Sequence, residues 1–160
     1  MSTLNKITPC LWFDTRAEEA ANFYVGLFEN SRILRVRRFG PGGPRPADMV
    51  LTVDFEIDGQ QITALNGGPE FTFSEAVSLQ VICDSQEESD RFWAALGEGG
   101  QESRCGWLKD RFGFSWQVFP AELDDLLDDP DPARAERAMR SMLSMTRIDL
   151  PEVRRAMDRA

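Results

Sequence analysis

The stretch AVSLQVICDSQEESDRFWAALGEGG, residues 76–100, contains the pattern that decides the fold. Its first part, residues 76–83, is an apolar run typical of a buried strand. Ser85 and Glu88 then have the spacing of a helix capping box. An apolar stripe at helical spacing follows, formed by Phe92, Trp93 and Leu96. The stretch therefore predicts a strand that leads directly into an amphipathic helix.

The same order of features occurs near the N-terminus, in ITPCLWFDTRAEEAANFYVGLF, residues 7–28. Its capping residues, Thr15 and Glu18, lie 70 residues before those of the later stretch. The apolar stripe also matches, because Phe23 lies 69 residues before Phe92. Agreement across strand, cap and stripe indicates a structural duplication.

Strand-like segments follow each helix. In the first half these are SRILRVRRF, DMVLTVDFEIDG and QITALNGG, and Asp58-Gly59 between the last two is typical of a hairpin turn. In the second half they are GQESRCGWLKD and FGFSWQVF. We predict an α+β fold of paired βαβββ modules, residues 7–68 and 76–120, within a single domain spanning 1–160.

The remaining residues, 121–160, predict a helical C-terminal extension. Asp131 is the expected N-cap of a helix that has Pro132 at its first position, and a last short helix starts near Pro151. One face of the longer helix carries small and methionine residues, namely Ala135, Met139 and Met142, with Met145 nearby. This stripe indicates packing on the sheet or on a partner subunit rather than a cofactor site.

Charge and composition exclude several classes of protein. The chain has 27 acidic and 18 basic residues and a net charge of −9, so we expect no nucleic-acid partner. The one basic cluster, residues 31–38, is best explained as a solvated strand face. No apolar run approaches the roughly 20 residues that span a bilayer, and the N-terminus has no signal-peptide pattern. We therefore expect a cytoplasmic protein with no membrane partner.

The chain contains no histidine, which excludes histidine triads, HExxH zinc sites and histidine bases. Its three cysteines, Cys10, Cys83 and Cys105, form neither a disulfide framework nor a zinc-type pair. Catalysis would have to use carboxylates, cysteines, Tyr24, lysines or a bound cofactor. No histidine is present to activate Cys105, so we interpret it as inert.

Five stretches together resemble one protein family over nearly the whole chain. They are ITPCLWFD, EEAANFYVGLF, LNGGPEFTFSEAVSLQVICDSQEESDRFWAAL, CGWLKDRFGFSWQVFP and DPDPARAERAMRSMLSMTRIDL. The sequence is similar to the PhnB-like branch of the vicinal oxygen chelate superfamily, which has the glyoxalase/bleomycin-resistance fold. Many members carry the description 3-demethylubiquinone-9 3-methyltransferase. The resemblance implies two modules whose sheets curl into a cup around a small-molecule site, and it implies a homodimer.

Metal enzymes of the superfamily place one ligand on each of four strands, usually His, Gln or Glu. Carried over by position, these ligands fall at or near Ile7, Ile62, Ser78 and Gln117. Two aliphatics, a hydroxyl and an amide do not form a usual metal site, so we expect no metal. We also expect no S-adenosylmethionine cofactor of the usual kind, because the first strand ends in FDTRAEE without the glycine-rich turn that it needs.

Strand alternation selects the candidate ligand-binding residues. Ser78 and Gln80 share one strand face, and Gln117 and Trp107 are expected to face the cup from neighbouring strands. Asn66 either shapes a turn beside two glycines or points its amide into the cup. The aromatic residues expected to fill the core, some beneath the helices, are Trp12, Phe114 and Trp116.

These observations favour a metal-independent small-molecule-binding protein, or an enzyme of unassigned reaction, with no cofactor. One alternative is a methyltransferase, as the family description says, or a lyase or dioxygenase with an unusual metal site. A second alternative is a resistance-type protein that sequesters its ligand unchanged. The fold hosts all of these functions, so the site must decide between them.

Overall fold

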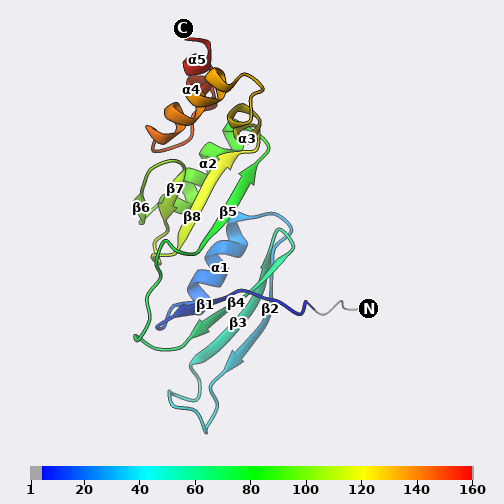
Figure 1. Ribbon diagram of the computed structural model, residues 1–160. Coiled ribbons are helices and arrows are strands. Elements are labelled where there is room, and N and C mark those ends of the chain that lie inside the picture. Colours follow the sequence, from blue (N-terminus) through cyan, green and yellow to red (C-terminus); the bar gives the residue numbers. More distant parts are fainter. Residues whose placement is uncertain (1–4, 160) are drawn as a thin grey trace. The chain divides into compact units, whose positions relative to one another are not determined.

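The computed structural model describes residues 5–159 and divides the chain into two compact units between Thr72 and Phe73 (Figure 1). Each unit has one four-stranded mixed sheet and a helix that follows its first strand. The predicted α+β fold with two βαβββ modules is confirmed. The division falls between the two predicted modules.

The first unit contains β1 (Cys10–Phe13), α1 (Ala17–Leu27), β2 (Arg32–Arg38), β3 (Val50–Ile57) and β4 (Gln60–Asn66). Its sheet has the order β1-β4-β3-β2, in which β1 runs parallel to β4 and the other pairs are antiparallel. Asp58 and Gly59 both have positive φ, +46° and +80°, in the turn that joins β3 to β4. The hairpin predicted from Asp58-Gly59 is confirmed.

The start of α1 differs from the sequence prediction. Thr15 and Glu18 do not form the predicted capping box; Arg16 occupies the N-cap and makes no side-chain capping bond. The first helical amide, that of Ala17, instead donates to Oδ1 of Asn66 at 2.9 Å. Asn66 lies opposite Phe13 at the end of β4, which places its amide beneath the first turn of the helix. A buried side chain from a distant strand thus replaces the local cap.

Trp12 also differs from its prediction. Its neighbours on β1, Leu11 and Phe13, are buried, whereas Trp12 is half-buried on the opposite face. The indole Nε1 donates to the Gly68 carbonyl at 2.9 Å, and the ring meets Phe71 edge-on at 4.9 Å. Trp12 therefore packs against the chain after β4 and not beneath α1. Alternation correctly separates the two faces of a strand but does not say which of them a helix covers.

The second unit begins with β5 (Ser78–Cys83), α2 (Gln86–Gly97), β6 (Gln101–Glu102), β7 (Trp107–Lys109) and β8 (Ser115–Pro120). Its sheet has the order β5-β8-β7-β6, with β5 parallel to β8. The predicted cap of α2 is confirmed, because Ser85 Oγ accepts from the Glu88 amide at 3.1 Å. The Glu88 carboxylate bonds back to the Asp84 amide at 2.9 Å, one residue earlier than in the usual box.

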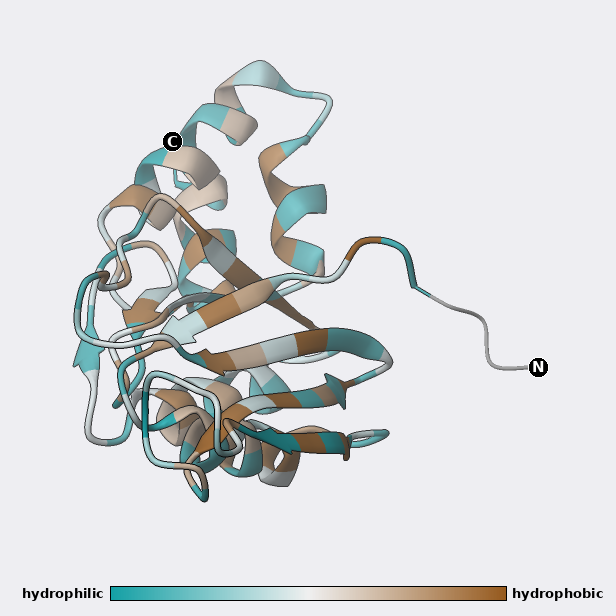
Figure 2. Cartoon of the chain, turned by 90° about the horizontal axis from the view of Figure 1, so that it is seen from below, coloured by the Kyte–Doolittle hydropathy of each residue, from teal (hydrophilic) through white to brown (hydrophobic). Residues whose placement is uncertain are grey.

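The C-terminal extension forms α3 (Glu122–Leu127), α4 (Pro132–Leu143) and α5 (Leu150–Asp158). Asp131 caps α4 as predicted, accepting from the Ala133 amide at 3.0 Å. Each of the longer helices is amphipathic, with teal and brown residues on different sides in Figure 2. The three helices and the chain between them enclose their own apolar cluster, formed by Leu123, Ala138, Ile148, Leu150, Val153 and Met157.

The methionine stripe is only partly correct. Met142 and Met145 pack against this cluster of the extension rather than on the sheet, and Met139 is 42% exposed, while packing on a partner subunit stays a prediction. Ala138 is the fully buried residue of α4. The helical spacing of apolar residues in the sequence therefore predicted the buried face of α4 about one residue out of register.

Candidate functional site

The second sheet has one face covered by α2 and one open face. Leu108, Trp116 and Val118 are buried on the covered face, at most 1% exposed. The alternate residues of the same strands lie on the open face. The strand register aligns them in two rows, Trp107–Gln117–Gln80 and Lys109–Ser115–Ser78.

Four of the predicted ligand-binding residues are brought together on this open face: Ser78, Gln80, Trp107 and Gln117. Gln117 Nε2 donates to Ser78 Oγ at 3.0 Å, which joins β8 to β5 and orients the amide. Gln80 is exposed, and Trp107 is half-buried.

Asn66, the fifth predicted residue, lies in the first unit and is 2% exposed. Its Oδ1 accepts from the Ala17 amide, and its Nδ2 donates to the Val50 carbonyl at 2.9 Å. Both ends of the amide are therefore engaged by backbone groups. These bonds give Asn66 a role in joining α1, β3 and β4.

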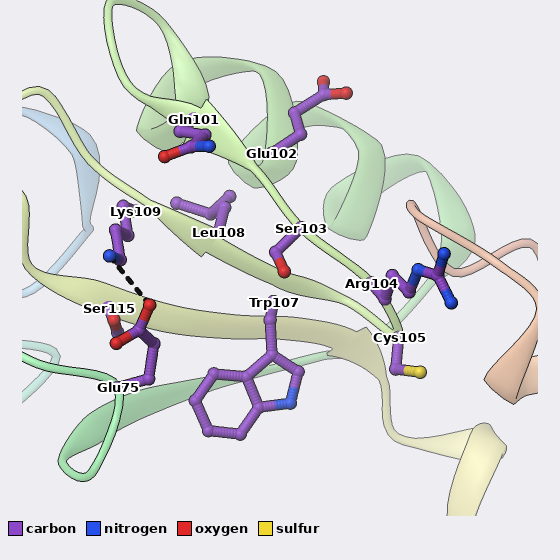
Figure 3. Close-up of a pocket in the computed structure, with 10 residues that line it drawn as sticks. All are labelled: Glu75, Gln101, Glu102, Ser103, Arg104, Cys105, Trp107, Leu108, Lys109 and Ser115. Atoms are coloured by element: carbon purple, nitrogen blue, oxygen red, sulfur yellow. Dashed lines mark ion pairs between the residues drawn. The ribbon is translucent and has the colours of Figure 1, made fainter.

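A pocket of about 440 Å³ lies beside β7 (Figure 3). Of the predicted ligand-binding residues, Trp107 lines it, whereas Ser78, Gln80 and Gln117 do not. Trp107 forms an aromatic wall, and the loop 103–105 borders the pocket at the end away from Lys109. Lys109, Ser115 and Glu75 lie together at the other end. The volume falls within the range of roughly 300–1,000 Å³ that is usual for small-molecule sites.

The charged end of the pocket is an ion pair. Lys109 Nζ lies 2.7 Å from a carboxylate oxygen of Glu75, which comes from the loop before β5. The hydrogen bond from Lys109 lowers the pKa of Glu75 below its ordinary value. The pair is thus intact at neutral pH, and on acidification it is lost as the pH falls through that lowered pKa.

Ser115 is the most unusual polar group of the pocket. Its side chain is 1% exposed, yet its hydroxyl has no hydrogen-bond partner within residues 5–159. A buried hydroxyl without a partner costs about 1–3 kcal/mol, so such groups are rare in folded proteins. Ser115 is one of the residues that line the pocket, but its Oγ is itself buried, so a bound molecule reaches the hydroxyl only if the lining around it shifts.

Asp110 positions the two strands that carry this end of the pocket. It is 2% exposed, and its carboxylate accepts from the amides of Phe112 and Phe114 and from Trp116 Nε1, at 2.9, 3.1 and 2.8 Å. These bonds close the turn between β7 and β8. The turn therefore sets the spacing of Lys109, on one side, from Ser115, on the other.

The positions that carry metal ligands in the superfamily do not fit a metal ion here. Ile7 precedes β1 and is 89% exposed, while Ile62 is buried in the core of the first unit. Ser78 and Gln117 supply only a hydroxyl and an amide, and these bond to each other. No group of three or more Cys, Asp or Glu residues with metal-binding geometry occurs between residues 5 and 159.

Lys109 and Ser115 lie two residues from Trp107 and Gln117 on the same strands, so alternation puts them on the same face, although they were not among the predicted residues. The signal for both was the strand alternation that selected Trp107 and Gln117. Glu75 had no such signal, because it lies in an irregular loop 34 residues before its partner. The unpartnered state of Ser115 is likewise a property of packing and has no counterpart in the sequence.

The chain thus combines two βαβββ modules with a small-molecule-sized pocket on the second sheet. The family model described as 3-demethylubiquinone-9 3-methyltransferase matches residues 5–119. The chain belongs to this family.

Solved structures resemble the chain to different degrees. The PhnB protein of Bacillus cereus, described as a 3-demethylubiquinone-9 3-methyltransferase, is 35% identical with a TM-score of 0.68, over 73% of this chain and 100% of that one. Protein PA1353 from Pseudomonas aeruginosa is 22% identical with a TM-score of 0.57, over 73% of this chain and 98% of that one. A glyoxylase/bleomycin resistance protein/dioxygenase domain from Frankia sp. EAN1pec is 15% identical with a TM-score of 0.46, over 74% and 93%. No curated protein matches the chain.

Proposed function

We propose that the chain is a small-molecule-binding protein of this family that uses the pocket of the second unit and needs no metal ion. The observation that carries the proposal is the buried, unpartnered hydroxyl of Ser115 at the charged end of the pocket. A bound molecule that exchanges a hydrogen bond with this hydroxyl removes the cost of leaving it unpaired. The pocket would then be more stable occupied than empty.

The lining of the pocket favours a flat molecule with a polar or anionic edge. Trp107 offers an aromatic wall on which a conjugated ring can stack. Lys109 and Ser115 lie at one end, where an ammonium and a hydroxyl can both donate to the same acidic group. A planar carboxylate meets all three contacts at once. Conjugated carboxylates are therefore the ligand class that we propose.

The methyltransferase description of the family receives no support from the architecture. An S-adenosylmethionine-dependent methyltransferase of the usual kind binds its cofactor at the switch point of a doubly wound sheet. Neither sheet here is doubly wound, since each has one parallel pair at one edge and antiparallel strands elsewhere. Binding, rather than methyl transfer, is the function that the site favours.

The test is calorimetric titration with 2-naphthoate, a flat anion, against cyclohexanecarboxylate, an anion that is not flat. We expect 2-naphthoate to bind more tightly, and Ser115→Ala to weaken it about tenfold through the loss of one hydrogen bond. Ser115→Ala should at the same time stabilise the empty protein by about 1 kcal/mol, because it removes the unpaired hydroxyl. Opposite signs for binding and stability are what distinguish a ligand-binding serine from a structural one.

Trp107→Leu should weaken binding of 2-naphthoate, whereas Trp12→Phe, in the first unit, is the matched control and should not. If wild type and Ser115→Ala bind 2-naphthoate with equal affinity, the proposed site is refuted. Recovery of unchanged 2-naphthoate after prolonged incubation separates binding from turnover. Affinity that rises with added Mn²⁺ or Zn²⁺ would contradict metal independence.

We also propose a homodimer in the cytoplasm. Within the second unit, β5 is an edge strand, and Val77 and Ile82 on or beside it are 65% and 58% exposed. Exposed apolar edge strands are commonly covered by another chain. Light scattering behind size exclusion should give twice the 18.1 kDa chain mass, and a monomer at micromolar concentration would refute the dimer.

Among the described residues, no helix is both long and apolar enough for a membrane span.

A further inference from the structure

The C-terminal extension lies beyond the part of the chain that the family model matches, which ends at residue 119. Its helices nevertheless belong to the same compact unit as the pocket. The chain between α4 and α5 contacts both the loop that borders the pocket and the start of α2. We call residues 145–150 the brace.

At one end, the brace bonds to the turn that precedes β7. The amide of Cys105 donates to the Met145 carbonyl at 2.8 Å, and the amide of Gly106 donates to the Thr146 carbonyl at 2.8 Å. The Gly106 carbonyl accepts in turn from the Val118 amide of β8 at 2.8 Å. The turn is therefore held on one side by β8 and on the other by the brace.

The turn has a backbone that needs such support. Cys105 and Gly106 both have positive φ, +59° and +82°, and this region is costly for a cysteine. A β-carbon at Gly106 would lie 2.8 Å from the Val118 carbonyl oxygen and 3.0 Å from Ile148 Cγ1. Only glycine leaves room for so close an approach between the brace and β8.

The supported turn leads directly into the pocket. Cys105 lines it, and Trp107, two residues later, forms its aromatic wall. Two more backbone bonds, from Ser103 to the Trp107 carbonyl at 2.9 Å and from Trp107 to the Arg104 carbonyl at 3.0 Å, tie the indole-bearing residue to the same turn. A shift of the brace would thus move the wall of the pocket.

At its other end, the brace is held by Gln86 in the first turn of α2. Gln86 Nε2 donates to the Ile148 carbonyl, and Gln86 Oε1 accepts from the Leu150 amide, both at 2.8 Å. Arg147 adds an ion pair to Asp90, one turn further along α2. One amide side chain therefore fixes the brace through both of its functional atoms.

We propose that the brace sets the position of Trp107 in the pocket and that Gln86 is the positioning residue that holds the brace. The positioning itself is independent of the ligand, while its effect on binding rests on the proposed function. The inference makes the extension, which the family model does not include, a part of the site.

The test uses ¹⁹F NMR of the full chain labelled with 5-fluorotryptophan, with each resonance assigned by a Trp→Phe variant. Gln86→Ala should shift or broaden the Trp107 resonance and leave that of Trp12, in the first unit, unchanged. Gln86→Glu loses the donor to the Ile148 carbonyl and places a carboxylate beside that of Asp90, so it should shift the Trp107 resonance as well. Glu87→Ala is the matched control, because it is exposed in the same helical turn.

A Trp107 resonance that Gln86→Ala leaves unchanged would overturn the inference. If Gln86→Ala moves every resonance to its unfolded position, Arg147→Gln replaces it and must shift Trp107 alone for the inference to stand. In the same variants the Kd of 2-naphthoate should rise about three- to tenfold. Wild-type protein that fails to bind 2-naphthoate would refute the proposed ligand class, while the Trp107 resonance would still decide whether Gln86 positions the wall.

Discussion

Replacing Asp110 by alanine should strongly destabilise the second unit. The carboxylate accepts three hydrogen bonds, and two of their donors, the Phe114 amide and Trp116 Nε1, belong to residues at most 2% exposed. Each buried donor left without a partner costs about 1–3 kcal/mol. With a smaller loss at the half-buried Phe112 amide, the total is about 3–5 kcal/mol. Domains of this kind are stable by only about 5–15 kcal/mol.

Urea unfolding followed by tryptophan fluorescence measures this loss. At this chain length a loss of 3–5 kcal/mol lowers Tm by roughly 8–15 °C. Asp110→Asn keeps one acceptor oxygen but turns an amide donor toward another donor, so about half the loss should remain. Asp125→Ala, an exposed aspartate on α3, is the control and should change stability by less than about 0.5 kcal/mol. A loss below about 1 kcal/mol for Asp110→Ala would refute the reasoning, because the three donors would then have found other partners.

Three further predictions concern single groups. Glu75→Gln should raise the affinity for 2-naphthoate up to about fivefold, because Lys109 loses its competing anion. Lys109→Gln should lower that affinity. If both variants bind 2-naphthoate as the wild type does, the ion pair does not face the ligand. Burial raises the pKa of Cys83 to about 11 from 9.0, so its thiolate fraction at pH 8 should be about a hundredfold lower than that of an ordinary thiol. Iodoacetamide should therefore label Cys83 much more slowly in the folded protein than in an unfolded control, and equal rates would contradict this. The same raised pKa means that Cys83 favours the folded state fully below pH 9 and that this contribution is lost as the pH rises toward 11. Asn66→Ala should cost about 2–4 kcal/mol in urea unfolding, because it leaves the Ala17 amide and the Val50 carbonyl unpaired, and a change within the error of the fit would show that water replaces the side chain.

How far the sequence predicts this protein depends on the range of the interaction concerned. The Asp58-Gly59 turn and the Ser85 cap involve residues within a few positions of each other, and both are confirmed. The cap of α1 was wrong because its true partner, Asn66, lies 49 residues beyond the amide that it accepts. A local capping residue competes with every buried polar group that the tertiary structure brings near the helix end. At Ala17 the backbone amide bonds to the buried side chain of Asn66 and not to a local cap.

The same distinction applies to the candidate site. Alternation put Trp107 and Gln117 on one face, and the strand register places them opposite each other. It could not find Glu75, whose contact with Lys109 depends on the path of an irregular loop. Nor could it find Gln86, which reads as an ordinary first-turn helix residue until the brace lies against it. Residues that position others are the hardest to predict, because their partners are backbone groups and not side chains.

The two tryptophans of the hairpin from Cys105 to Pro120 have different roles: Trp116 stabilises the core, and Trp107 lines the pocket. Trp116 is 1% exposed, and its indole is held by Asp110, so its polar and apolar atoms are all satisfied inside the protein. Trp107 lines the pocket from β7, and Ser115, with its unpaired hydroxyl, lies on the adjacent strand β8 opposite Lys109. An alanine at position 115 would fold with less cost, since nothing within residues 5–159 bonds to the hydroxyl. An unpaired polar group that lowers the stability of the empty protein and lies in the wall of a cavity is more simply explained by what enters the cavity than by the fold that encloses it.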